Sequence, residues 1–158
     1  MPKTIRYTTK APDSVKGIPH IFRHKIEKIG HSIKLIEAND RYSDEAITLV
    51  FFPIVSRTGT DIDASVRDIT DNKPAILVVL HHTFDPECIV SDSSKFVERE
   101  NTLVVDCLFF EDKGLLECKR NEKAYDDAVK WLKSQQKSRQ RQKKSGKKGT
   151  AAKICTIL

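Results

Sequence analysis

Two runs of almost unbroken apolar residues, 46–52 (AITLVFF) and 74–80 (PAILVVL), constrain the fold of this chain more than any other feature. Successive side chains of a β-strand point to opposite faces of a sheet, so a strand that is apolar throughout must be buried on both faces. Strands of this kind are typical of parallel sheets that helices cover on each side. A further strand is predicted over 102–110 (TLVVDCLFF). The core of the protein is therefore predicted to be a parallel sheet.

Helical patterns lie between the predicted strands. Apolar residues recur at helical spacing in three segments, and Gly30 follows the first of them at a position where helices commonly end. The apolar stripes consist of Ile18, Ile21, Phe22, Ile26 and Ile29, of Ile62, Val66 and Ile69, and of Tyr125, Ala128, Val129 and Leu132. Two shorter strands are predicted over 3–9 and 31–36. This alternation predicts an α/β domain over residues 1–133, with an open, doubly wound, mainly parallel sheet of about five strands, flavodoxin-like or Rossmann-like.

The charge of the chain is unevenly distributed. Its 158 residues carry a formal net charge of +6, but nine of the 28 Lys and Arg residues lie beyond Leu132, where there is no acid. Residues 1–132 therefore hold 19 bases against all 22 acids, and this part is mildly acidic. The distribution argues against a nucleic-acid-binding face on the domain and makes the basic character a property of the tail.

The tail is poor in apolar residues and ends in a lipidation signal. Residues 134–154 consist mainly of Lys, Arg, Gln, Ser and Gly and cannot bury enough surface to offset their ordering entropy. We expect them to form a disordered, flexible polybasic tether, with a helical start at most. Residues 155–158 (CTIL) have the CaaX form, in which the cysteine fourth from the end accepts a prenyl group. Leu158 favours geranylgeranyl, which Cys155 would carry.

The lysines of the tail are expected to complete the membrane anchor. A single prenyl chain holds a protein at a membrane only reversibly, so stable residence requires a second signal. Each cation near an anionic leaflet adds about 1 kcal/mol. The lysines closest before the motif are Lys143, Lys144, Lys147 and Lys148. The expected partners are a prenyltransferase and an anionic membrane surface, at the cytoplasmic face of the plasma membrane. The alternative is a nuclear-localisation or RNA-binding tail with Cys155 unmodified.

This tail resembles the prenylated polybasic tails of Ras-type and Rho-type small GTPases. The body, however, lacks a G-x-x-x-x-G-K-[ST] phosphate loop, and residues 72–75 (NKPA) lack the aspartate of a guanine-reading N-K-x-D motif, so a GTPase is not predicted. No stretch approaches the roughly 18 apolar residues that span a bilayer, and the first twenty residues are too charged for a signal peptide. We therefore expect the protein to stay in the cytosol.

One polar loop on the ligand side of the predicted sheet is a candidate binding site. Ligands of doubly wound sheets lie beyond the carboxyl ends of the strands. The loop after the strand at 46–52 is rich in hydrogen-bond donors and leads into a predicted helix start, where an anion such as a nucleotide phosphate would be well received. Its candidate ligand-binding residues are Ser56, Arg57, Gly59, Thr60 and Asp61. The alternative is that Thr60 or Asp61 caps the helix and Gly59 forms the turn.

The segment 59–63 (GTDID) resembles the G-T-x-x-E element of nucleoside 2-deoxyribosyltransferases and related N-glycosidases. The resemblance covers about 40 residues and implies that Asp63 occupies the position of the catalytic carboxylate. In that chemistry, a carboxylate attacks or stabilises an oxocarbenium-like sugar carbon. Asp63 departs from the family pattern because it is one methylene shorter than Glu. The alternative is an ordinary aspartate on a helix surface.

A pair of histidines, His81 and His82, follows the apolar run at 74–80 and precedes Asp85. His82 is a further candidate ligand-binding residue at the carboxyl end of this strand. A metal site would need additional ligands, for which only Cys88 or Asp106 could be proposed without a spacing rule. Strand-end histidines more often form hydrogen bonds to a neighbouring loop, so neither a metal nor another cofactor is predicted.

Residues 47–132 also resemble a group of short, uncharacterised animal proteins. The shared stretches are P-I-V-S-R-T-G-T-D, L-V-V-L-H-H-T-F-D-P and V-D-C-L-F-F-E-D. The resemblance implies a common fold and transfers no mechanism. The sequence thus predicts a prenylated, membrane-tethered, non-enzymatic binding module whose ligand is a protein partner or, alternatively, a nucleotide. The competing hypothesis is a nucleoside or nucleotide N-glycosidase, or deoxyribosyltransferase-like enzyme, that uses Asp63.

Overall fold

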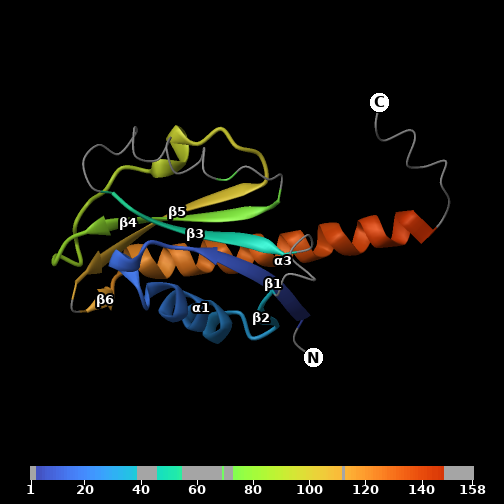
Figure 1. The fold of residues 1–158 in the computed structure, drawn as a ribbon, viewed down its shortest axis with the longest axis horizontal. Helices are drawn as coiled ribbons and strands as arrows, with labels where there is room; N and C mark the ends of the chain where they lie inside the picture. Colours follow the sequence, from blue (N-terminus) through green and yellow to red (C-terminus); the bar gives the residue numbers. More distant parts are fainter. Residues whose placement is uncertain (1–2, 39–45, 55–68, 70–72, 112, 148–158) are drawn as a thin grey trace.

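The computed structural model describes residues 3–38, 46–54, 69, 73–111 and 113–147. Its strands are β1 (Lys3–Lys10), β2 (Ile33–Glu37), β3 (Ile47–Pro53), β4 (Ala75–His82), β5 (Thr102–Phe110) and β6 (Gly114–Leu115). The helices are α1 (Ile18–Ile29) and α3 (Lys119–Lys147), with two 3-10 helices, η1 (Asp13–Val15) and η3 (Ser93–Phe96). The strands form one six-stranded sheet in the order β2-β1-β3-β4-β5-β6 (Figure 1). The chain therefore has a mixed α/β fold, as predicted.

The sheet is mainly parallel, which confirms the prediction drawn from the apolar runs. Strands β1 to β5 run parallel to their neighbours, whereas β6 is antiparallel to β5. The central strand β4 is buried continuously from Ala75 to Leu80. A strand at this position contacts a layer on each face and has a neighbour at each edge, so apolar residues are required throughout.

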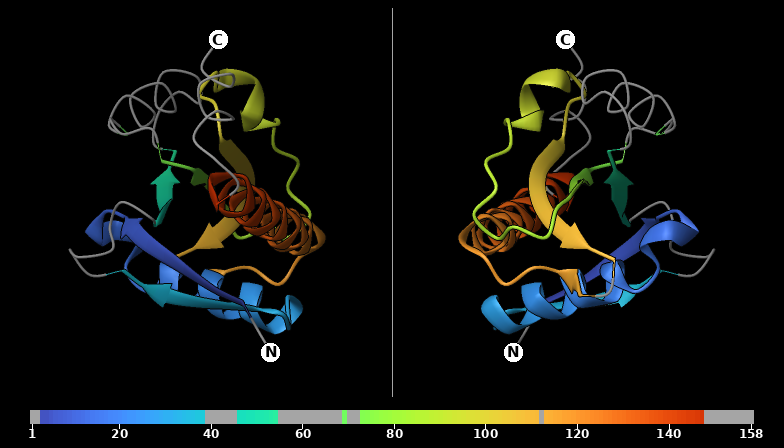
Figure 2. Two further views of the ribbon diagram at one scale, coloured as in Figure 1. Left: turned by 90° about the vertical axis from the view of Figure 1, so that its right-hand side faces the viewer. Right: turned by 90° about the vertical axis from the view of Figure 1, so that its left-hand side faces the viewer.

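Helices α1 and α3 pack on the same face of the sheet. Figure 2 shows the arrangement from the two ends of the molecule. Phe22 of α1 lies at the centre of this layer, with its ring centroid 5.5 Å from that of Phe51 in β3 and 5.6 Å from that of Tyr125 in α3. All three rings are buried in the larger hydrophobic core. This core joins the two helices to the sheet as one unit.

The opposite face of the sheet carries a second, smaller core. Val50, Leu77 and Val79 are buried there together with Ile69. The loop between β4 and β5 contributes Val97, which packs against this cluster, and η3 lies in the same loop. The helix predicted around Ile62 and Val66 lies outside the described residues, apart from Ile69.

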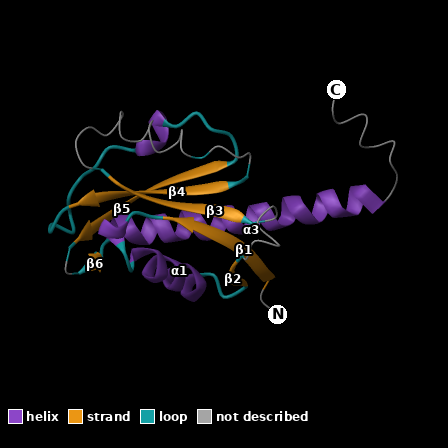
Figure 3. Ribbon diagram, viewed as in Figure 1, coloured by secondary structure: helices purple, strands orange, loops and turns teal. Residues whose placement is uncertain are grey.

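Helix α3 extends beyond the sheet. It starts beside the carboxyl ends of the parallel strands, runs along the sheet and continues past it on the other side (Figure 3). Its 29 residues end at Lys147, so the backbone of residues 134–147 is helical, whereas the sequence predicted a disordered tether from residue 134. No helix in the described part of the chain is both long and apolar enough to cross a membrane. The end of α3 and the carboxyl ends of the strands therefore lie at opposite ends of the molecule.

Candidate functional site

Most of the residues predicted for a ligand site lie outside the described part of the chain. These residues are Ser56, Arg57, Gly59, Thr60, Asp61 and Asp63. The same holds for Cys155 and Lys148, whereas Lys143, Lys144 and Lys147 belong to the last turns of α3. Among the predicted ligand-binding residues, His82 has a described position, at the last residue of β4.

His82 is part of an aromatic group at the carboxyl end of the sheet. Its ring lies 5.3 Å from that of Phe109 and 5.1 Å from that of Phe110. The Phe84 ring lies 6.3 Å from that of Phe110 and is 79% exposed. His82 Nε2 is 3.5 Å from Oε1 of Glu111. We call His82, Phe84 and Phe110 the aromatic tip.

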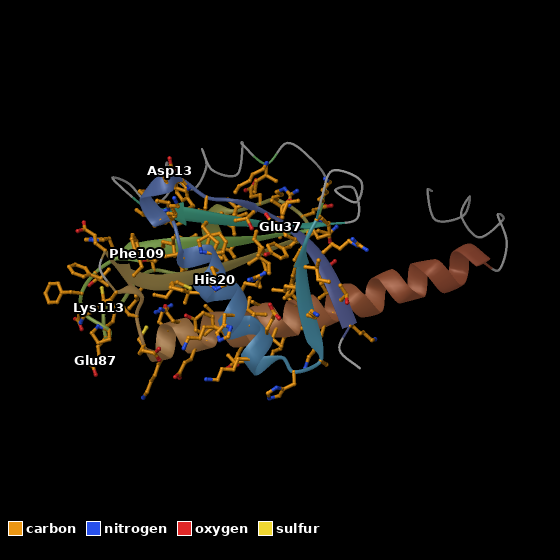
Figure 4. All side chains as sticks on the ribbon, turned by 60° about the horizontal axis from the view of Figure 1, so that its bottom comes forward. Asp13, His20, Glu37, Glu87, Phe109 and Lys113 are labelled. Atoms are coloured by element: carbon orange, nitrogen blue, oxygen red, sulfur yellow. The ribbon has the colours of Figure 1, made fainter. Side chains whose placement is uncertain are left out.

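The loop that follows β4 and contains Phe84 carries another exposed apolar residue, Ile89, which is 92% exposed. Figure 4 places Phe109, Glu87 and Lys113 at one end of the molecule, away from the far end of α3. Large apolar side chains scattered singly over a surface are ordinary, but a group of them commonly marks a place where another protein binds. The aromatic tip is therefore a candidate docking surface.

The other histidine of the pair, His81, points into the protein instead. Its Nε2 lies 2.8 Å from Oδ1 of Asp106 in β5. Ser93, at the start of η3, donates its hydroxyl to the same Oδ1 and its backbone N–H to Oδ2 over 3.1 Å. Ser93 and Asp106 are buried. We call His81, Ser93 and Asp106 the anchor cluster, because it attaches the β4–β5 loop to the sheet.

The pKa of Asp106 reflects both its burial and its hydrogen bonds. Burial in itself raises the pKa of this carboxyl. The hydrogen bonds from His81 and from Ser93 act in the other direction, and together they hold the pKa of Asp106 below its ordinary value of 3.8. Asp106 is therefore a carboxylate at neutral pH, and all of its donors stabilise that form.

The anchor cluster lacks the geometry of a catalytic site. A nucleophilic serine must be accessible to its substrate and is commonly activated by a histidine, but Ser93 is completely buried and its hydroxyl donates to Asp106 and not to His81. Within the described residues, no group of three or more His, Cys, Asp and Glu side chains is placed to hold a metal ion. His81 instead contributes to loop attachment, the alternative that the sequence offered for a strand-end histidine.

A groove runs along the outer edge of β5, the edge that faces away from β4. A cavity of about 520 Å³ lies there, lined by Val90 and Val97 of the β4–β5 loop, by Val104 of β5 and by Lys123 of α3. A second cavity of about 690 Å³ adjoins it, because Arg120 and Lys123 line both. The second cavity continues past Ile89, towards the exposed part of the loop. Both volumes lie in the range of ligand sites.

Asn121 satisfies the outer edge of β5 at Leu108, beyond the β5 residues that line the groove. This residue of α3 is completely buried, and its side-chain Oδ1 accepts the N–H of Leu108 over 2.7 Å. Its Nδ2 donates to the carbonyl oxygens of Leu108, over 2.9 Å, and of Leu116, over 2.8 Å. The carboxamide of Asn121 thus satisfies β5 as the peptide group of a neighbouring strand would.

Comparisons with known proteins identify no relative: no protein-family model matches the chain, and no curated protein or solved structure matches it. Function must therefore be argued from the chain itself.

The sequence contained one signal for the anchor cluster. Asp106 stands within an otherwise mostly apolar strand, and a buried carboxylate requires donors nearby. Its donors, His81 and Ser93, are 25 and 13 residues away, and no spacing rule identifies them. Asn121 had no comparable signal, because a polar residue in the first turn of a helix is ordinarily exposed.

Proposed function

We propose that this protein is a prenylated, membrane-tethered, non-enzymatic module that binds a protein partner through the aromatic tip and the groove along the outer edge of β5. The observation that carries the proposal is the arrangement of the molecule along its long axis. The carboxyl ends of β4 and β5, beside which the aromatic tip lies, are at the end where α3 starts, and α3 runs from there to the opposite end of the molecule (Figure 1). Arg120 and Lys123, in the first turns of α3, also line the groove. A module tethered through its tail would present this binding end to the cytosol.

The tether consists of a lipid and a set of charges. Cys155 carries a geranylgeranyl group, and the lysines before it bind an anionic leaflet. Prenyltransferases recognise the four-residue form that residues 155–158 (CTIL) have. A prenyltransferase and the cytoplasmic face of the plasma membrane are thus the partners of the tail.

A protein suits the binding end better than a nucleotide does. The aromatic tip offers exposed rings, and Phe84 has most of its side chain in solvent. Apolar surface of this kind is typical of protein–protein contacts. The nucleotide alternative and the N-glycosidase alternative depend on Arg57, Gly59 and Asp63, which lie outside the described residues, so both stay predictions.

We also propose that the sheet is doubly wound. The order of its parallel strands, β2-β1-β3-β4-β5, is the order of flavodoxin-like sheets. Ile69 is buried against the face opposite α1 and α3, which supports a covering layer on that face. The fully apolar strand β4 requires such a layer on both of its faces.

Subcellular fractionation of the full chain in animal cells tests the tether. Cys155→Ser removes the lipid acceptor and leaves only screened charges, so the variant should move from membranes to the cytosol. Replacing Lys143, Lys144, Lys147 and Lys148 by Gln should weaken plasma-membrane residence while the intact mass still includes a geranylgeranyl group. Replacing Lys28, Lys34, Lys113 and Lys130 by Gln is the control for loss of four charges. A Cys155→Ser variant that pellets with membranes as fully as the wild type would refute the tether.

A further inference from the structure

Backbone groups on the outer edge of β5 have no partners among the described residues. Backbone N–H and C=O groups of a strand point alternately to its two edges. The carbonyl oxygens of Asn101 and Phe109 accept from β4, so odd-numbered residues face β4 and even-numbered residues face outwards. Leu108 faces outwards and is satisfied by Leu116 and Asn121.

The next outward-facing residues along the strand are Asp106, Val104 and Thr102. No strand or side chain in the described part of the chain pairs with the backbone of Val104 or Asp106 on this edge. The side chain of Asp106 is fully engaged in the anchor cluster, but its backbone groups are not. The ladder of β5 therefore stops in mid-strand, next to a cavity, with donors and acceptors available to a further strand.

The walls of the groove suit a single extended strand. One wall is the β4–β5 loop, with Val90 and Val97, and the other is α3, with Ala124 and Lys123. A strand added to β5 would point alternate side chains at these two walls. The corresponding edge of a second copy would be recessed between the same two walls, so two such edges could not approach each other closely. The shape thus favours a peptide segment of a different protein.

The positive charge of Arg120 at one end of the groove favours an acidic residue in the bound segment. Arg120 is half-buried, and its Nη2 donates to the carbonyl oxygen of Val90 over 3.4 Å. None of the carboxylates in the described ranges pairs with it, whereas Lys123 has Asp127 as a partner at 3.8 Å. A half-buried guanidinium gains most from a carboxylate, with which it forms short, charge-assisted hydrogen bonds. An acidic side chain beside the Asp106 end of the edge would complement Arg120.

We propose that the protein partner binds as an extended segment that adds a strand to the outer edge of β5 and places an acidic residue beside Arg120. The proposal rests on the proposed function, which it deepens by naming the mode of recognition. Backbone hydrogen bonds to Val104 and Asp106 supply affinity. The two walls contact alternate side chains of the bound segment and determine specificity. Asn121 marks the end of the site, because its carboxamide already occupies the next position of the ladder.

The test begins with a library of short linear peptides displayed on phage, selected against the full, unprenylated chain. Enriched peptides should alternate apolar and polar residues and share an acidic residue. Synthetic copies of the best peptide are then methylated at single backbone nitrogens. Methylation at the nitrogens that donate to β5 should weaken binding about tenfold each, and methylation at the intervening nitrogens should leave it unchanged.

Two protein variants locate the site. Val104→Pro removes an outward N–H from an edge where proline is tolerated, and Arg120→Glu reverses the charge at the end of the groove. Each should weaken peptide binding about tenfold or more, provided that thermal unfolding shows a folded protein. Lys130→Glu, on an exposed position of α3 outside the groove, is the matched control and should bind as the wild type does.

The possible outcomes separate this proposal from the proposed function. A library that yields no binder, or binders insensitive to every backbone methylation, would overturn strand addition. Binders that tolerate Val104→Pro but are lost in Phe84→Ala would place recognition at the aromatic tip, leaving the module a protein binder. Self-association that Val104→Pro abolishes would make a second copy the occupant. The lipid plays no part in any of these measurements, so failure of the tether would leave them unaffected.

Discussion

The anchor cluster and the outer edge of β5 meet at Asp106 but differ in how their polar groups are satisfied. The carboxylate of Asp106 accepts from His81 and twice from Ser93, so both of its oxygens have protein partners. The backbone of the same residue faces a groove and has no partner on that side in the described structure. Polar groups that are fully paired attach one part of a protein to another, whereas unpaired groups beside a cavity are available to a ligand. The cluster therefore has a structural role, and the edge is where we propose that a partner binds.

The largest effect on stability is expected from Asp106→Ala, which removes the carboxylate that the anchor cluster shares. It leaves the donors of Ser93 and His81 without an acceptor in a buried site, so the free energy of unfolding should fall by about 3 kcal/mol. Urea unfolding of the full chain measures this change. Asp92→Ala is the control: Asp92 accepts from Ser94 in the same loop but is exposed, so the loss should stay within about 1 kcal/mol. Equal losses in both variants would contradict the role given to the cluster.

A somewhat smaller loss is expected from Asn121→Ala. The buried carboxamide satisfies both backbone groups of Leu108 and the carbonyl oxygen of Leu116. Its removal should lower the free energy of unfolding by about 2 kcal/mol, since water can reach part of the edge that is opened. Glu122→Ala, at the exposed neighbouring position, should change stability by less than about 0.5 kcal/mol. If Asn121→Ala were as stable as Glu122→Ala, the carboxamide would not act as a strand substitute.

The pH dependence of stability gives a still smaller effect of defined sign. The pKa of Asp106 in the folded protein lies below its unfolded value. The stabilisation from this group is therefore fully present above a pH of about 4 and is lost as the pH falls through the lower, folded-state pKa. Asp106→Asn should remove this part of the acid sensitivity, so that unfolding curves of wild type and variant converge towards low pH. A constant difference between them from neutral to acid pH would show that ionisation of Asp106 does not contribute.

The regular elements were predictable from sequence because each depends on local periodicity. Helix α1 begins and ends at the predicted residues, Ile18 and Ile29, since its apolar stripe repeats at helical spacing and Gly30 follows it. Strand β5 likewise has the predicted bounds, Thr102 and Phe110. The parallel direction of the sheet followed from strands that are apolar at every position.

The site could be predicted only in part, because it depends on contacts between residues far apart in the chain. The sequence located His82 correctly at the end of β4, but it had no means of separating His82, which is exposed, from His81, which points inwards. Strand β6 has two residues and went unpredicted, since such a short segment has no periodicity. The groove depends on where β6 ends and on the face of the sheet against which α3 packs. Neither feature can be predicted from the local sequence pattern.

Amide hydrogen exchange of the free protein, resolved by residue with NMR, tests the central contrast most directly. The N–H groups of Val105 and Cys107 face β4, and that of Leu108 is bonded to Asn121, so all three should exchange slowly. The N–H groups of Val104 and Asp106 face the groove and should exchange much faster, although they belong to the same strand. This alternation is the predicted result. Protection of Val104 and Asp106 equal to that of Leu108 would show that the outer edge of β5 is already paired, and would contradict its assignment as a binding site.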